Sequence, residues 1–217
     1  MNEIGIRDSV TRTAQMMARA GLAEAFGHVS MRWNDGFAIT STLPFTAADP
    51  ADVVIVSDPI DPPSGGDGAP LETPMHAAIY LARSDVGAIC RGHPPAVVAW
   101  GVGTGDLPLL HGLGALAGER VSVHGDVDLV STLDQGTAVA AALGSGHALI
   151  LRTNGCFAVG ATVLESITRL YFLQERARVA MEASSRKGVA DWGGRLRHTT
   201  AEMPRAMAWM EATFGSG

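Results

Sequence analysis

The fold of this chain is decided by residues 71–100, which read L-E-T-P-M-H-A-A-I-Y-L-A-R-S-D-V-G-A-I-C-R-G-H-P-P-A-V-V-A-W. Thr73 followed by Pro74 is typical of a helix N-cap with proline at the first helical position, which predicts a helix that runs to about Arg83. The apolar run Val86–Cys90 predicts a short buried strand after it. We therefore expect this stretch to contribute one helix and one central strand to the fold.

Two polar side chains flank the helices of this stretch. Glu72 lies directly before the first helix, and His93 lies just before a second helix that we expect over residues 96–100. Both side chains are therefore expected at corners between strands and helices. Catalytic and binding residues are often held on a rigid frame at such corners.

Outside this stretch, the hydrophobic pattern predicts further helices and strands. Residues 26–40 alternate around Asn34-Asp35-Gly36, which predicts a β-hairpin. Thr162 with Glu165 predicts a capping box at the start of a long helix that reaches Met181. Further helices are expected over residues 9–20 and 137–143, and further strands over 52–58, 121–123, 148–151 and 156–159. This order of elements predicts a layered α/β domain on a mixed sheet.

Length and charge limit the class of protein. The 217 residues match the size of one domain, so we expect a single domain over 1–217. Its less regular end, residues 185–217, is expected to act as a docking or interface tail. Lys and Arg number 16 against 22 Asp and Glu, and the net charge of −6 argues against nucleic acid or an anionic membrane as partner.

The cellular location is inferred from two further features. The N-terminal residues lack the apolar core of a signal peptide, and no apolar run is long enough to span a bilayer. Cys90 and Cys156 both lie inside apolar segments, as reduced and buried thiols do. We therefore expect a cytoplasmic protein that has no membrane partner.

Four motifs, in this order, resemble the class II aldolase/adducin family. They are G-H-V-S at 27–30, E-T-P-M-H-A-A-I-Y-L-A-R-S-D-V at 72–86, G-H-P-P at 92–95 and L-R-T-N-G-C-F-A-V-G-A-T-V-L-E-S at 151–166. The resemblance covers roughly residues 8 to 183. It implies a three-layer α/β/α sandwich around a mainly antiparallel sheet, often assembled as a homotetramer with sites near subunit interfaces. Enzymes of the family usually bind a divalent metal and act on a small hydroxy-carbonyl substrate through an enolate-like intermediate.

The resemblance also implies roles for individual residues. The family's catalytic acid/base falls on Glu72, and its three metal-binding histidines fall on Arg91, His93 and Asn154. Arginine stays protonated and has no lone pair to offer, so the family's metal site cannot be assembled as such. A divalent metal such as Zn, Mn or Fe is expected only through a remodelled set of His93 with Glu72 and either His28 or His111. Otherwise no cofactor is expected.

Two comparisons within the family narrow the substrate. Pro70 and Leu71 before the acid, and Ala25-Phe26 before the hairpin, lack the hydroxyl donors that a phosphate needs, which argues against a phosphorylated sugar. The segments L-L-H-G-L-G-A-L-A-G at 109–118 and G-D-V-D-L-V-S at 125–131 resemble the family's decarboxylase branch. That branch acts on hydroxylated aromatic dicarboxylates.

These comparisons lead to the hypothesis of a lyase that decarboxylates a hydroxyaromatic carboxylate. Loss of CO2 beside a ring hydroxyl requires an acid for the ring carbon and a positive group for the developing negative charge. Glu72 is the candidate acid, and Arg91 is the candidate positive group, with a planar fork able to bind a carboxylate through two bonds. His93 is the third candidate catalytic residue. The candidate substrate-binding residues are His28, His111, Asn154 and Arg152.

Each candidate also has a purely structural interpretation. Glu72 would be favourable charge at a helix N-terminus, Arg91 a buried ion-pair partner, His93 a cap for the next helix and Asn154 a turn residue. His28 and His111 would serve packing, and His76 is interpreted as a structural hydrogen-bonding group. No role is assigned to His124, His147 and His198.

Two other functions stay open. The first is a metal-independent cyclase, dehydratase or aldol-type enzyme on the same scaffold. The second is a catalytically inactive binding protein, as adducin shows that the fold permits. A scaffold has no need of an acid beside a histidine, so the pair Glu72 and His93 favours an enzyme.

Overall fold

A mainly antiparallel sheet forms the middle layer of the structure, which is a computed structural model. The structure describes residues 1–103, 105–193, 195 and 197–215, and for residues 197 and 198 it describes the backbone only. Within these residues the sheet has seven strands in the order β3-β2-β1-β4-β7-β6-β5, and only β5 and β6 run parallel. The strands are β1 (His28–Trp33), β2 (Gly36–Ile39), β3 (Val54–Val56), β4 (Ala88–Gly92), β5 (Ser122–His124), β6 (Ala148–Leu151) and β7 (Cys156–Gly160).

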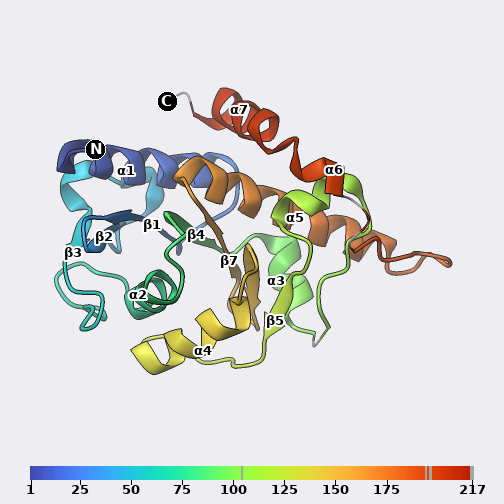
Figure 1. The fold of residues 1–217 in the computed structure, drawn as a ribbon, viewed down its shortest axis with the longest axis horizontal. Helices are drawn as coiled ribbons and strands as arrows, with labels where there is room; N and C mark the ends of the chain where they lie inside the picture. The colour runs from blue at the N-terminus through green and yellow to red at the C-terminus, as the bar shows by residue number, and fades with distance from the viewer. Residues whose placement is uncertain (104, 194, 196, 216–217) are drawn as a thin grey trace.

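Helices cover both faces of this sheet (Figure 1). One core layer packs α1, α3 and α5 on the first face, and a second core layer packs α2 and α4 on the opposite face. The α-helices are α1 (Glu3–Arg19), α2 (Thr73–Ala82), α3 (Pro95–Gly101), α4 (Leu133–Leu143), α5 (Val163–Ala183), α6 (Arg197–Thr200) and α7 (Met203–Phe214), and the 3-10 helices are η1 (Phe45–Ala47), η2 (Pro50–Asp52) and η3 (Gly112–Ala117). The predicted α/β/α sandwich is confirmed.

The central strand β4 is buried along its whole length, because it pairs with β1 on one side and β7 on the other and is covered by helices on both faces. This explains why Ala88, Ile89 and Cys90 form an apolar run without alternation, while the buried Arg91 that follows them needs polar partners. The strand begins at Ala88, two residues after the predicted start, because Val86 and Gly87 belong to the connection from α2.

The beginning of α2 differs from the prediction by one residue. Glu72, not Thr73, is the N-cap, and its side chain makes no capping hydrogen bond. The Thr73 hydroxyl instead donates to the Pro70 carbonyl at 2.6 Å. The Glu72 carboxylate is thereby left available for a contact outside the helix.

Helix starts also differ from the sequence pattern, and α1 begins at Glu3, six residues before its predicted start. Helix α4 begins at Leu133, four residues before the predicted start, because Thr132 and Gln135 form a capping box that the sequence analysis overlooked. At α5 the predicted capping box is half formed. The Thr162 side chain accepts from the Glu165 N–H at 3.1 Å, but the Glu165 carboxylate accepts from the N–H of Ala161 instead of that of Thr162.

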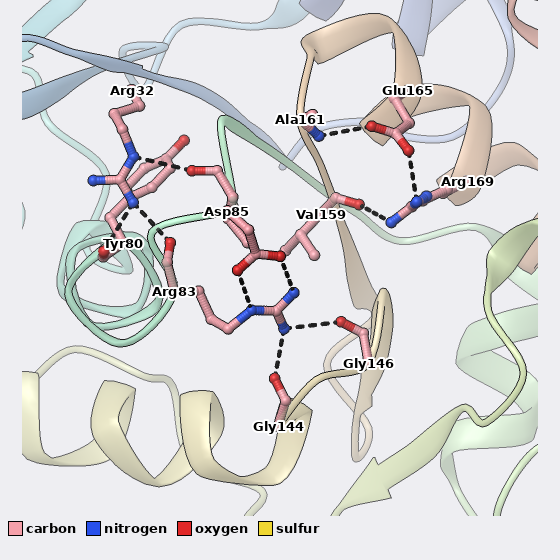
Figure 2. A network of polar contacts seen from close by, with 11 residues as sticks. Arg32, Tyr80, Arg83, Asp85, Gly144, Gly146, Val159, Ala161, Glu165 and Arg169 are labelled. Atoms are coloured by element: carbon pink, nitrogen blue, oxygen red, sulfur yellow. Dashed lines mark hydrogen bonds and ion pairs between the residues drawn. The ribbon is translucent and has the colours of Figure 1, made fainter. Parts of the chain in front are cut away.

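A network of arginines holds the C-terminal end of α2 in place (Figure 2). Arg32 of β1 donates to the carbonyls of Tyr80 and Arg83, each at 2.8 Å. Arg83 pairs with Asp85 at 2.7 Å and also donates to the Gly144 and Gly146 carbonyls beyond α4. Because a helix is rigid, these contacts also restrain Glu72 at its other end.

The C-terminal segment packs back onto the same chain. Trp209 of α7 makes an edge contact with Tyr171 of α5, with 5.0 Å between ring centroids, and Met210 is fully buried. Arg12 of α1 pairs with Glu211 at 3.2 Å. Whether residues 185–217 also contact another subunit stays a prediction.

In the part of the chain that the structure describes, no helix combines the length and the apolar character that crossing a membrane requires.

Candidate active site

Five candidate residues from four separate segments meet at one end of the sheet. Glu72 stands at the start of α2, Arg91 lies in β4 with His93 just beyond it, His28 is the first residue of β1, and Asn154 lies in the turn between β6 and β7. They border a cavity of about 400 Å³. Its wall is completed by Glu24, Ala25, Phe26, Gly27, Ser41, Thr42, Leu43, Phe45, Pro70, Leu71 and Leu129.

The guanidinium of Arg91 is the centre of this site. It is 1% exposed, and its Nη2 donates to Glu72, with 2.8 Å to Oε2 and 3.1 Å to Oε1. The same nitrogen donates to the backbone carbonyl of Asn154 at 3.1 Å. Nη1 donates to Nε2 of His93 at 2.6 Å. The two guanidinium nitrogens of Arg91 that were expected to bind a substrate carboxylate therefore already donate to protein groups.

These contacts define the protonation state of His93. Nη1 of Arg91 lies 2.6 Å from Nε2 of His93 and 3.2 Å from its Nδ1. Because Arg91 can only donate, the closer nitrogen, Nε2, is assigned the lone pair, and Nδ1–H then donates to the Phe26 carbonyl at 3.2 Å. Burial, followed by the positive charge of Arg91, lowers the pKa of His93. Both observations describe a neutral imidazole.

The pKa of Glu72 is shifted in the opposite direction to the pKa of His93. Its carboxyl group lies almost out of contact with solvent, and this burial raises its pKa above the usual value, while the charge and hydrogen bonds of Arg91 oppose the rise. Burial disfavours the charged form of a carboxyl group, so a raised pKa is what an acid that donates a proton requires.

A second layer of polar groups lies behind the cavity. His76 of α2 is fully buried, and its Nδ1 contacts Ser30 Oγ at 2.7 Å, which in turn contacts Tyr80 Oη at 2.8 Å. Burial, and then the charge of Arg91, lowers the pKa of His76 to about 3. The same two causes lower the pKa of His28 well below its usual value. Both rings are therefore neutral near pH 7.

Three buried nitrogens near this layer have no protein partner among the described residues. They are Nδ1 of His28, Nε2 of His76 and Nε of Arg91. The rings of His28 and His76 are 5.7 Å apart. The interpretation of His76 as a structural hydrogen-bonding group accounts for its Nδ1 but not for its Nε2.

The side chains do not fit a divalent metal ion. A zinc-type site needs three or four ligands at roughly 2 Å from one ion. Here the Arg91 cation occupies both the Nε2 lone pair of His93 and the Glu72 carboxylate. In residues 1–103, 105–193, 195 and 197–215, no group of three or more His, Cys, Asp and Glu side chains is arranged to hold a metal.

Two candidates lie away from the cavity. His111 caps η3, and burial is the main cause of its lowered pKa, with Glu175, Arg176 and Arg178 as the nearby charges. Arg152 follows β6 but does not contribute to the cavity wall. A remodelled metal set that combines His93 with His111 is therefore not assembled within one chain. The side chain of His198 lies outside the described residues.

The cavity also contains residues that the sequence analysis did not select. Ser41 and Thr42 follow β2, with Thr40 between, and both line the cavity. Neither belongs to the two segments, Ala25-Phe26 and Pro70-Leu71, whose lack of hydroxyl donors argued against a phosphorylated sugar. The position of Ser41 and Thr42 after a strand end was the available signal, because strand ends carry many site residues. Leu129 comes from a distant loop, and its place in the segment 125–131 gave no indication that it would reach the cavity.

The seven-stranded sheet between two helical layers, with a cavity at its end that charged and polar side chains border, defines a class II aldolase-like α/β/α protein. Residues 8–181 match the family described as "Class II Aldolase and Adducin N-terminal domain". The chain therefore belongs to the class II aldolase/adducin family. This confirms the resemblance stated from the four sequence motifs.

Relatives with assigned activities include two decarboxylases. The chain is 25% identical over 206 residues to a 3,4-dihydroxyphthalate decarboxylase of Arthrobacter keyseri, covering 87% of this chain and 82% of that protein. It is 27% identical over 221 residues to the protein of the same name from Rhodococcus jostii, covering 88% and 89%. At the level of the family, these relatives support a decarboxylating or aldolase-like lyase.

Solved structures share the fold. The L-fuculose 1-phosphate aldolase of Glaciozyma antarctica superposes with a TM-score of 0.77 at 19% identity, covering 97% of this chain and 90% of that one. At this identity the similarity concerns the fold alone.

Proposed function

We propose that this protein is a lyase that decarboxylates a non-phosphorylated hydroxyaromatic carboxylate through an enolate-like intermediate. The observation that carries the proposal is the buried pair of Arg91 and Glu72, which stands beside His93 at the cavity. The similarity to two 3,4-dihydroxyphthalate decarboxylases supports this choice among the reactions of the family.

The shape and lining of the cavity suit an aromatic acid. A volume of about 400 Å³ lies within the range of roughly 300–1,000 Å³ that small-molecule sites occupy. Four of the lining side chains are large, apolar and exposed, and a ring can pack against them: Phe26, Leu43, Leu71 and Leu129. Among the polar residues of the wall, Arg91 contacts Glu72, His93 and Asn154, and such a polar group can fix the orientation of a ligand.

The residues can carry out each part of the reaction. Glu72 gives its proton to the ring carbon that bears the carboxylate, and the hydroxyl oxygen gives up its own proton and becomes a carbonyl. The bond to the carboxylate then breaks, CO2 leaves, and the electron pair passes through the ring onto that oxygen, where the fixed positive charge of Arg91 stabilises the developing negative charge. The oxygen regains a proton and Glu72 regains one from water, so one proton is consumed in each turnover. The neutral His93 and His28 orient the hydroxyl group.

The test is CO2 release from a panel that contains 3,4-dihydroxyphthalate and simpler hydroxybenzoates. We expect release by the wild type and a loss of about 10²- to 10⁴-fold in Glu72→Gln, because general acid catalysis contributes on that order. Glu182→Gln is the matched control, since Glu182 is an exposed residue of α5 far along the chain from the cavity wall. No CO2 from any panel member would reject a decarboxylase.

The second candidate function is a cyclase, dehydratase or aldol-type enzyme on the same scaffold. It is favoured by the contacts of Arg91. Both terminal nitrogens of its guanidinium already donate to protein groups, so no free pair of donors remains for a substrate carboxylate. Conversion of a substrate without CO2 release would support it. A folded protein that binds aromatic acids but converts none of them would support an inactive binding protein.

The working assembly is part of the same proposal. We expect a homo-oligomer, a tetramer in the first instance, with residues 185–217 at a subunit contact. Trp192 and Trp209 support this, since they are 42% and 41% exposed. The buried free thiols of Cys90 and Cys156 fit a protein of the cytoplasm. Light scattering of the full chain, compared with a chain ending at residue 184, measures the assembly.

A further inference from the structure

Arg91 is surrounded by the kinds of atoms that usually hold a metal ion. Its guanidinium contacts carboxylate oxygens of Glu72, the Nε2 of His93 and the backbone carbonyl of Asn154. Oxygen and imidazole nitrogen are the usual ligands of divalent cations in proteins. Here one planar cation, supplied by the chain itself, satisfies all of them from the centre.

We propose that the Arg91 guanidinium is the resident cation of this cavity and replaces a divalent metal ion there. Its charge holds Glu72, His93 and the turn at Asn154 in a fixed arrangement, and the same charge faces the negative charge of the reaction. This inference deepens the proposed function and rests on it for the reaction, but not for the binding of metal. An arginine suits this role because it stays charged at any physiological pH.

The backbone supports a permanent arrangement of this kind. Arg91 lies in the central strand, directly opposite His28 of β1 and Phe157 of β7. Gly155 has a φ of +80°, and a Cβ there would lie 2.3 Å from the Gly92 carbonyl oxygen and 2.8 Å from His93 Cδ2. Only glycine lets the turn approach this closely, and the approach brings the Asn154 carbonyl to the guanidinium.

A second cation at this place would be unfavourable. A metal bound to His93 Nε2 would need the lone pair that Nη1 occupies at 2.6 Å, and it would stand next to a like charge. Arg91 cannot leave without exposing a buried carboxylate that has lost its partner. The wild type should therefore exclude divalent ions from the cavity.

The first experiment measures metal in the wild type. The full chain is incubated with Zn²⁺, Mn²⁺ or Co²⁺, desalted and subjected to elemental analysis, with His93→Ala as the matched control. We expect much less than one equivalent in the wild type and the same residual amount in the control. One equivalent in the wild type that is lost in His93→Ala would overturn the proposal.

The second experiment replaces the Arg91 guanidinium with groups that can bind a metal ion. The double variant Arg91→His/Asn154→His offers three imidazoles with His93, and we expect it to bind about one equivalent of Co²⁺ with visible d–d absorption. The control Arg91→Met/Asn154→His lacks the cation but offers only two imidazoles. If the double variant folds by circular dichroism yet binds no more Co²⁺ than this control, the proposal is wrong. If the double variant does not fold, the wild-type measurement decides.

The two proposals fail separately. If the wild type binds no His93-dependent metal and releases no CO2 from any panel member, the decarboxylase is rejected and the resident cation is kept. A wild type that releases CO2 and carries one equivalent of His93-dependent metal would keep the decarboxylase and reject the resident cation.

Discussion

His28 and Arg91 are direct cross-strand partners in the antiparallel pair of β1 and β4. Residues opposite each other in a sheet share a face, so the imidazole of His28 lies beside the guanidinium at the cavity. Burial and this neighbouring charge both lower the pKa of His28. The strand register thus places one fixed cation among neutral imidazoles, and the predictions below follow from that arrangement.

The pair of Arg91 and Glu72 should show strong energetic coupling. Arg91→Met leaves a buried carboxyl group without its cation, and we expect a loss of about 3–5 kcal/mol in the free energy of unfolding. Glu72→Gln alone should also destabilise. The double variant should lose less than the sum of the two, with a coupling of about 1–3 kcal/mol measured by urea unfolding at pH 7. Additive losses would contradict the buried ion pair.

The turnover rate should fall as the pH rises through the raised pKa of Glu72. The carboxyl group must be protonated to give its proton to the ring carbon, and burial raises the pKa at which that proton is lost. The neutral form of His93 is kept over the same range, because its pKa is lowered. A profile of kcat against pH measures the effect. Residual activity of Glu72→Gln that kept the same decline would assign it to another group.

Stability should fall in acid through His76. Its pKa is about 3 in the folded chain against the ordinary value of 6.5, so between these pH values the unfolded chain binds the additional proton. The contribution to stability is complete above pH 6.5 and decreases toward pH 3, by up to about 1.4 kcal/mol per pH unit.

The matched variant for His76 is His76→Asn, which does not titrate and keeps an acceptor near Ser30 Oγ. Urea unfolding of both proteins between pH 4 and 6.5, which lies inside the window where the difference is expected, measures the slopes. The variant should show the flatter dependence on pH. Equal slopes would mean that His76 is already protonated in the folded protein.

Arg176 should be a major structural residue. Its guanidinium is almost fully buried and donates to the backbone carbonyls of Pro108 at 3.0 Å, Gly118 at 2.7 Å and Leu107. Arg176→Met leaves these three carbonyls, and that of Glu119, without their donor, at about 1–3 kcal/mol each. We expect a loss of at least about 3 kcal/mol by urea unfolding, with faster hydrogen exchange over residues 107–119.

Arg178 provides the control on the same helix. It is half exposed and pairs with Glu175 and Glu182 at the surface. Arg178→Met should change the free energy of unfolding by less than about 1 kcal/mol, because exposed ion pairs contribute little. Similar losses in both variants would show that removal of an arginine from α5 matters more than its buried contacts.

Local signals in the sequence were sufficient for most elements. The hairpin of β1 and β2 turns at Asn34 and Asp35, as the alternating pattern predicts, with Trp33 opposite Gly36. The helix α5 begins directly after Thr162, as predicted. Boundaries failed where two signals competed. Thr73 resembles an N-cap, but its hydroxyl turns back to Pro70 and Glu72 takes the N-cap position.

Membership of a motif did not by itself place a residue in the site. Glu72, His28, His93 and Asn154 lie in motifs and do reach the cavity, whereas Arg91, at its centre, lies just outside the quoted motifs. His111 and Arg152 also lie in motifs, yet neither of them lines the cavity. The distance between segments depends on how loops cross the sheet, and no local pattern contains that information. Ser41, Thr42 and Leu129 were missed for the same reason.

The sequence by itself determined which chemical groups are present: an acid at the start of a helix, an arginine and a histidine at the end of a strand, and an asparagine in a turn. Its four motifs indicated the family, and its periodicity and turn residues, which act over short distances, predicted the layered fold. Only the tertiary structure decided that the guanidinium of Arg91 points toward Glu72 and His93. The direction of a side chain depends on the strands and helices packed around it. Here β1 and β7 flank β4, and the end of α2 places the carboxylate within 2.8 Å of the guanidinium.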